Sequence, residues 1–221
     1  IISNVGKLNA NTVLYLQTSN MVELKEFKND VKAILWSTQN GQSQGVGMAN
    51  QIFGEVNPSG KLTFTWFADE DQIPGIRQYG MNKAYGKDEK EYSHGGWTYQ
   101  YSTADKEYAF GYGLSYTNYE YSNVNVNTST VDANGKLTVT ATIKNAGQMD
   151  GSEVVQVYVK YPQASNVPDG MIKQIKGFAK VDLAKGESKN VSIDLDVSDF
   201  CFWDGEKEVV PAGEYTIEVG A

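Results

Sequence analysis

The chain has 221 residues, of which 40% are apolar and 21% are charged, so it can form a packed core and global disorder is not expected. Its 19 basic side chains against 27 acidic ones give a net charge of −8, with one arginine, Arg77, so no basic surface for nucleic acid is expected. One cysteine and one histidine exclude an internal disulfide, a cysteine metal cluster and a multi-histidine metal site, and no apolar run is long enough to span a bilayer.

Residues 1–66 predict an α/β arrangement. Apolar runs rich in β-branched residues are typical of strands covered on both faces, and apolar residues at helical spacing predict helices. The predicted elements are a helix ending at residue 8, strands at 12–17 and 31–36, a helix at 46–53 capped by Gly54, and a strand at 62–66. Alternating strands and helices predict a parallel sheet. Because so few strands cannot bury both faces of such a sheet, we expect the end of a larger α/β domain.

Residues 67–112 form a connecting segment without a clean period. Ten of the 14 tyrosines of the chain fall between Tyr79 and Tyr121. Because each ring has a large apolar area to bury, the segment is not expected to be disordered. We predict that residues 79–112 are ordered and lie across the junction between the α/β part and the following domain.

Residues 113–221 predict an all-β domain. Runs that alternate apolar and polar residues occur at 137–143, 154–159, 189–195 and 214–219. Glycine-bearing turns separate them, at Gly135, Gly151, Gly186, Gly205 and Gly213. Short strands with regular turns are typical of a β-sandwich of the immunoglobulin or fibronectin type III kind. The expected fold is therefore a partial α/β sandwich with parallel strands, followed by a fibronectin type III-like β-sandwich.

Short motifs follow one another along nearly the whole chain. They are AILWSTQNGQSQG at 33–45, ANQIFGEVNPSGKLTFT at 49–65, FGYGLSYT at 110–117, EVVQVYV at 153–159, KGF at 176–178, LAKGE at 183–187 and GEYTIEVG at 213–220. This ordered set resembles the C-terminal α/β domain and the fibronectin-like domain of glycoside hydrolase family 3. Residues 96–101 resemble the β-xylosidase-like branch, although Trp97 and Gln100 stand where that branch usually has arginines.

The resemblance implies that the parent protein is a retaining β-glycosidase that releases terminal, non-reducing β-linked glucose or xylose from oligosaccharides. Such enzymes use two carboxyl groups about 5–5.5 Å apart. The family takes its nucleophilic aspartate from a barrel domain and its acid/base glutamate from an earlier loop of the α/β domain, and no segment here resembles either motif. We therefore expect no catalytic residue, no cofactor and no metal site in this chain.

The expected partners follow from the same resemblance. They are the glycoside substrate and the missing N-terminal part of the same enzyme. Neither nucleic acid nor a membrane is expected as a partner, and a homo-oligomer is left as an alternative. The chain would be a fragment, a processed product or one part of a longer protein, and some family members place the barrel last. A different class of function is a non-catalytic module that binds carbohydrate or a protein partner.

Several residues have a functional and a structural interpretation. Trp97, Tyr99 and Tyr92 are candidates for a sugar-stacking rim, but packing between the two domains is favoured. The acids at 69–71 are interpreted as a solvated loop rather than a catalytic pair, because neighbouring acids point different ways. His94 is interpreted as a polar loop residue, and Cys201, next to three aromatic residues, as a buried thiol.

Overall fold

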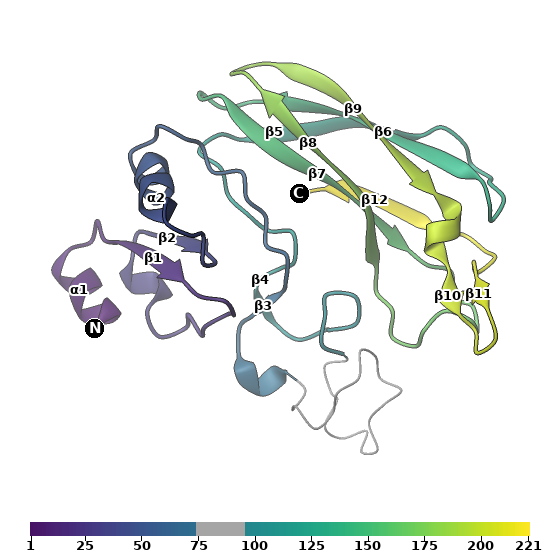
Figure 1. The fold of residues 1–221 in the computed structure, drawn as a ribbon, viewed down its shortest axis with the longest axis horizontal. Coiled ribbons are helices and arrows are strands. Elements are labelled where there is room, and N and C mark those ends of the chain that lie inside the picture. The colour runs from purple at the N-terminus through teal and green to yellow at the C-terminus, as the bar shows by residue number, and fades with distance from the viewer. Residues whose placement is uncertain (74–95) are drawn as a thin grey trace.

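The computed structural model describes residues 1–73 and 96–221. An α/β part and a β-sandwich lie side by side, joined by extended segments (Figure 1). In chain order the helices and strands are α1 (Ile2–Leu8), β1 (Val13–Gln17), the 3-10 helix η1 (Lys28–Asp30), β2 (Ala33–Ser37), α2 (Gln44–Ile52), β3 (Trp66–Phe67), η2 (Glu70–Gln72), β4 (Lys106–Tyr108), β5 (Tyr119–Val126), β6 (Lys136–Asn145), β7 (Gly151–Lys160), β8 (Gln174–Leu183), β9 (Ser188–Asp196), η5 (Val197–Phe200), β10 (Phe202–Trp203), β11 (Glu208–Val209) and β12 (Thr216–Gly220).

The α/β part contains the predicted parallel strands. β1 and β2 pair in parallel without a register shift, from Val13 opposite Ala33 to Gln17 opposite Ser37. Both predicted helices are present, and α2 is followed by Gly54 with a φ of 81°, the left-handed conformation expected at a helix end. The sequence patterns therefore predicted both helices and both parallel strands of this part to within about two residues, the usual uncertainty of an element's ends.

The strand predicted at 62–66 is wrong except at Trp66. β3 holds only Trp66 and Phe67 and pairs antiparallel with β4. Leu62 instead donates its N–H to the carbonyl of Tyr112 and accepts the N–H of Gly111, both at 2.8 Å. Because Gly111 turns away with a φ of 84°, this pairing does not extend into a ladder. The alternation of residues 62–66 fits a strand, but the neighbouring segment forms a ladder only with Trp66 and Phe67.

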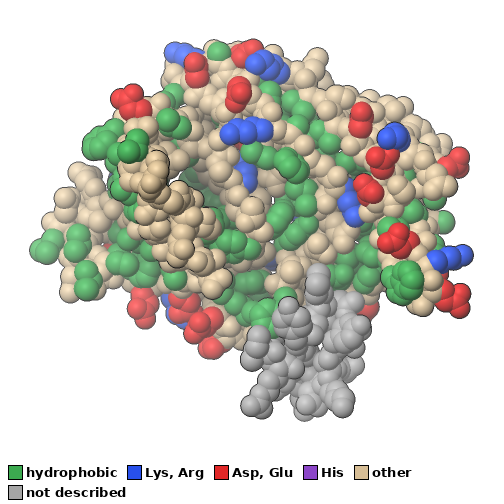
Figure 2. Space-filling view, in the orientation of Figure 1, with side chains coloured by type: hydrophobic (Ala, Val, Ile, Leu, Met, Phe, Trp, Pro, Cys, Tyr) green, Lys and Arg blue, Asp and Glu red, His purple; other side chains and the backbone are tan. Residues whose placement is uncertain are grey.

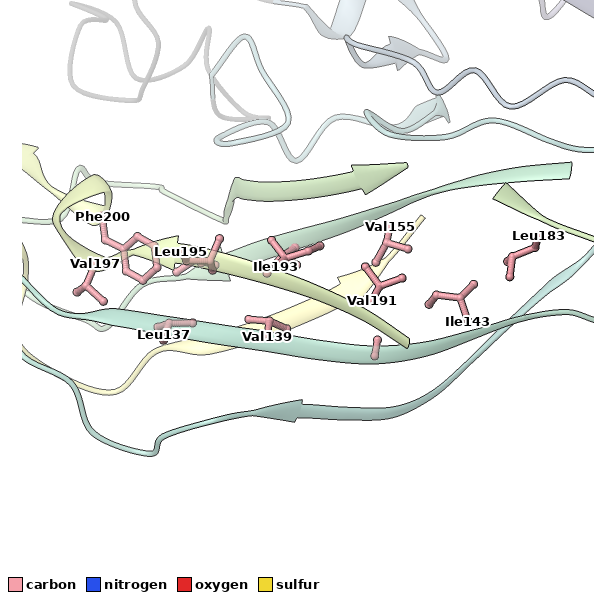
Figure 3. Packing of buried hydrophobic residues seen from close by; sticks show 13 residues of the cluster. Leu137, Val139, Ile143, Val155, Leu183, Val191, Ile193, Leu195, Val197 and Phe200 are labelled. Atoms are coloured by element: carbon pink, nitrogen blue, oxygen red, sulfur yellow. The ribbon is translucent and has the colours of Figure 1, made fainter. Parts of the chain in front are cut away.

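The β-sandwich consists of two three-stranded antiparallel sheets, ordered β12-β7-β8 and β5-β6-β9, with a separate β10–β11 hairpin. The inward residues of both sheets form its core together with residues of η5 (Figure 3). The core residues are Leu137, Val139, Ala141, Ile143, Val155, Val157, Val159, Leu183, Val191, Ile193, Leu195, Val197 and Phe200. The runs predicted at 137–143, 154–159, 189–195 and 214–219 fall in β6, β7, β9 and β12.

Apolar side chains remain exposed on the α/β part, at the left in Figure 2. α2 has no buried residue, and Leu8, Val46 and Phe53 are well exposed. Within the described residues β1 and β2 pair only with each other, so each leaves one edge unpaired. This matches the expectation that two parallel strands cannot cover both of their faces. No helix in residues 1–73 or 96–221 has the length and hydropathy needed to cross a bilayer.

Candidate functional site

The candidate site is the junction where the α/β part meets the sandwich. Asn57, in the turn after α2, is its first anchor, and both its amide nitrogen and its amide oxygen form hydrogen bonds. The Asn57 Nδ2 donates to the carbonyl of Asp150 at 2.9 Å, and its Oδ1 accepts from the Ser115 hydroxyl and from the Tyr116 N–H, both at 2.8 Å. One side chain therefore ties together three segments that are far apart in the sequence.

A buried ion pair is the second anchor. The Lys61 Nζ lies 3.1 Å from the Glu153 Oε1, and the two side chains are only 13% and 5% exposed. Lys61 also donates to the carbonyl of Gly113 at 2.9 Å, and Glu153 accepts the Val154 N–H at 2.7 Å. Both charges thus have a second polar contact, which a buried pair needs in order to offset its loss of solvation.

The chain approaches itself closely beside this ion pair. A Cβ placed on Gly113 would lie 2.0 Å from the carbonyl oxygen of Gly60, so only glycine fits at this position without a shift of the backbone. The Asn-Pro-Ser-Gly turn and the Phe-Gly-Tyr-Gly motif therefore meet at this point.

Aromatic rings fill the side of the junction that belongs to the α/β part. The indole of Trp66 lies edge-on to Trp36 and Tyr108, at centroid distances of 5.9 and 6.3 Å, and stacks with Phe64 at 5.9 Å. The Trp66 Nε1 donates to the carbonyl of Val22 at 2.8 Å. Trp66 is only 2% exposed, so this cluster is the small core of the α/β part and its connection to β4.

A second aromatic group belongs to the sandwich side. The ring of Tyr99 stacks on Phe110 with centroids 4.1 Å apart and meets Tyr158 edge-on at 6.1 Å. The Tyr99 hydroxyl accepts the N–H of Ile175 at 3.0 Å. Burial raises the pKa of Tyr158 to about 12, and its hydroxyl donates to the Gln156 Oε1. Tyr99 is therefore held against the outer face of the sheet that contains β7 and β8.

The candidate site residues named from the sequence do not all lie at the junction that the structure describes. Tyr99 contacts the sandwich as described, and Trp97 is half-buried. Tyr92 and His94 lie outside the described residues. The same holds for residues 79–95 of the segment predicted to cross the junction. Residues 96–112 include β4 and the two rings, Tyr99 and Phe110, that contact Tyr158 of the sandwich.

The acidic residues at 69–71 lie in and next to the short 3-10 helix η2. Asp69 caps η2, because its side chain accepts the N–H of Asp71 at 3.0 Å. This backbone hydrogen bond, with a contribution from Lys25, lowers the pKa of Asp69. Cys201 is a free thiol that is half-buried rather than fully buried. In the part of the chain that the structure describes, no three or more His, Cys, Asp or Glu side chains converge to hold a metal ion.

Sequence reasoning missed the ion pair and the role of Asn57 in this junction. The signal for Asn57 was present, since the turn was recognised at 57–60, but its partners come from residues that lie far away in the sequence. Lys61 and Glu153 stand in two different motifs, and neither motif alone indicates that a lysine and a glutamate meet.

The comparison with protein families decides the identity of these domains. Residues 1–116 match the glycosyl hydrolase family 3 C-terminal domain, and residues 153–221 match the fibronectin type III-like domain. The chain belongs to glycosyl hydrolase family 3. The resemblance seen in the motifs and the expected fold class are thereby confirmed.

Known members of the family are similar over the whole chain. An exo-alpha-(1->6)-L-arabinopyranosidase of Bifidobacterium longum is 37% identical, and a beta-xylosidase of Formosa agariphila is 31% identical, with all of this chain and 29% of each relative covered. Beta-glucosidase 3B of Thermotoga neapolitana, solved with alpha-D-glucose, superimposes with a TM-score of 0.83 at 33% identity, over 99% of this chain and 31% of that structure. The chain thus spans less than a third of each of these proteins.

Proposed function

We propose that this chain is the supporting C-terminal part of a retaining β-glycosidase that hydrolyses terminal, non-reducing β-linked glucose or xylose. The observation that carries the proposal is the family match over residues 1–116 together with relatives that are named as glycosidases. In this proposal the sandwich supports the α/β part, and the α/β part supports the catalytic cleft. The arabinopyranosidase among the relatives adds L-arabinopyranose to the candidate sugars.

The catalytic carboxyl groups are proposed to come from the rest of the enzyme. A retaining mechanism needs one carboxylate as nucleophile and a second carboxyl as acid/base, about 5–5.5 Å apart. Two of the acids closest to the junction already have structural tasks: Glu153 neutralises Lys61, and Glu107 pairs with Lys28 at 2.7 Å. Neither is therefore available to attack a sugar or to protonate a leaving group.

The exposed apolar surface of the α/β part is the proposed contact with that rest of the enzyme. Leu8, Val46 and Phe53 would be covered, and one free edge of the β1–β2 pair would receive a further parallel strand. The covered length of the relatives, below one third, leaves ample chain to supply these elements. We also keep the division into 1–66, 67–112 and 113–221 as a proposal, with the ion pair and Asn57 joining its first and last units.

Hydrolysis by the chain alone tests this function. The purified 221-residue chain is expected to give no turnover of 4-nitrophenyl β-glucoside or β-xyloside, whereas the full-length protein that contains it hydrolyses at least one of them. Mixing the chain with the separately produced remainder should restore activity if the apolar surface is the contact. Turnover by the chain alone, or an inactive full-length protein, would contradict the proposal.

Substitution of Trp97 and Tyr99 separates packing from sugar binding. We propose that both rings hold the two domains together, so Tyr99→Ala is expected to lower the melting temperature of the full-length enzyme by several degrees, as the loss of roughly 1–2 kcal/mol would. Its KM should stay the same, and Trp97→Ala should behave similarly. An unchanged melting temperature with a raised KM would assign these rings to a sugar subsite instead.

A further inference from the structure

The β10–β11 hairpin carries an exposed tryptophan that the junction does not use. Trp203 is 67% exposed, whereas Trp66 is buried and Trp36 and Trp97 are half-buried. The hairpin lies at the end of the sandwich remote from α1 and α2 (Figure 1). An indole has a large apolar surface, and leaving it in water forgoes a stabilisation that the other tryptophans obtain by burial.

The hairpin that presents Trp203 is held rigidly. Asp204, at the turn, accepts the N–H groups of Glu206 and Lys207, both at 2.9 Å, and its own N–H donates to the carbonyl of Lys207 at 3.0 Å. On the other side of the strand, Phe202 packs on Tyr161 with ring centroids 4.7 Å apart. The backbone that carries Trp203 is therefore positioned by the fold.

A carboxylate and an ammonium group lie in the same hairpin as the Trp203 ring. Glu208 is directly opposite Trp203 in the antiparallel pair, so both side chains stand on the same face of the hairpin. Lys207 is the preceding residue and is exposed. Within residues 1–73 and 96–221, neither Glu208 nor Lys207 forms an ion pair. The hairpin thus offers an apolar ring face, a carboxylate acceptor and an ammonium donor, although Lys207 also interacts electrostatically with Asp204.

This combination suits a neutral sugar. The C–H face of a pyranose is apolar and can lie on an indole, while its hydroxyl groups donate to a carboxylate and accept from an ammonium. A cationic ligand could also bind the ring, because Asp204, Glu206 and Glu208 make the hairpin acidic, and polylysine is therefore included in the test below. We propose that Trp203 and Glu208 form a binding platform for a β-linked xylan or glucan chain, separate from the catalytic centre. The choice of polysaccharide rests on the proposed glycosidase function.

Affinity electrophoresis of the full-length protein tests the platform. Native gels containing wheat arabinoxylan or barley β-glucan are expected to retard the wild-type protein. Trp203→Ala should weaken the association constant by about tenfold or more, Trp203→Phe should retain part of it, and Glu208→Ala should weaken it as well. Phe178→Ala is the matched control, because Phe178 is 70% exposed on β8 and should leave both retardation and hydrolysis unchanged.

The outcomes separate this platform from the proposed function. Hydrolysis of 4-nitrophenyl glycosides reports on the enzyme, and retardation reports on the hairpin, so either can fail alone. The melting temperature of each variant shows whether it folds. If Trp203→Ala does not fold, Trp203→Phe and Glu208→Ala still test the platform. No retardation of the wild type, or equal retardation of Trp203→Ala and wild type, would overturn the platform. Binding of polylysine or self-association that depends on Trp203 would overturn it too.

Discussion

Replacing Lys61 by alanine is expected to lower the free energy of unfolding by about 3–5 kcal/mol. The reason is that Glu153, only 5% exposed, would keep its charge in a buried site without its partner. The carbonyl of Gly113 would lose its donor at the same time. Urea unfolding of wild type and variant, with comparison of midpoints and slopes, measures the loss.

An exposed ion pair supplies the control for this prediction. Lys136 and Asp196 are 2.8 Å apart, but their side chains are 74% and 50% exposed, so Lys136→Ala should cost far less stability than Lys61→Ala. The double variant Lys61→Met, Glu153→Leu should recover part of the stability, because it removes both buried charges together. Equal losses for Lys61→Ala and Lys136→Ala would show that burial does not decide the strength of the junction pair.

The strands of the sandwich show when a sequence pattern suffices. β6 and β9 alternate strictly, with Leu137, Val139, Ala141 and Ile143 inward on β6, and their ladder has no register shift. Such a strand is determined by its own residues, since every second side chain faces the core. Both were therefore predicted from the sequence.

Two of the long strands of the sandwich, β5 and β8, escaped prediction for a local reason. β5 is interrupted by a register shift between Ser122 and Asn125, where Asn123 has a φ of 52°, so its inward residues change phase. β8 contains Gly177, whose missing side chain leaves room for Ile193 and Leu195, and its ladder with β7 shifts between Val157 and Tyr158. A bulge breaks the period of two on which strand prediction depends.

The candidate site was predicted only in part because its contacts are long-range. The aromatic content of the connecting segment predicted a junction, and Tyr99 was named as a candidate ring, but its stacking on Phe110 follows only from the fold. The exposure of Trp203 could not be predicted from the aromatic run at 200–203, in which Phe200 is buried and Trp203 is exposed. Local sequence does not distinguish these neighbours, since their environment is set by η5 and the hairpin.

The second large effect is expected at the aromatic cluster of the α/β part. Trp66→Ala should lower the free energy of unfolding by about 3–5 kcal/mol, because the removal of the large side chain would leave a cavity between Trp36, Phe64 and Tyr108. The carbonyl of Val22 would also lose its donor. Trp66→Phe should lose less, since a ring would still fill most of the space.

The two tryptophans of opposite exposure make this prediction specific. Trp203→Ala removes the same side chain from a position that is 67% exposed, and its effect on stability should stay within about 0.5 kcal/mol. Because β3 pairs with β4, the loss at Trp66 should also loosen the segment that carries β4. Limited proteolysis should then cut the Trp66→Ala protein between residues 53 and 112, faster than it cuts wild type. Equal stability of the Trp66→Ala and Trp203→Ala proteins would mean that the aromatic cluster does not hold the α/β part together.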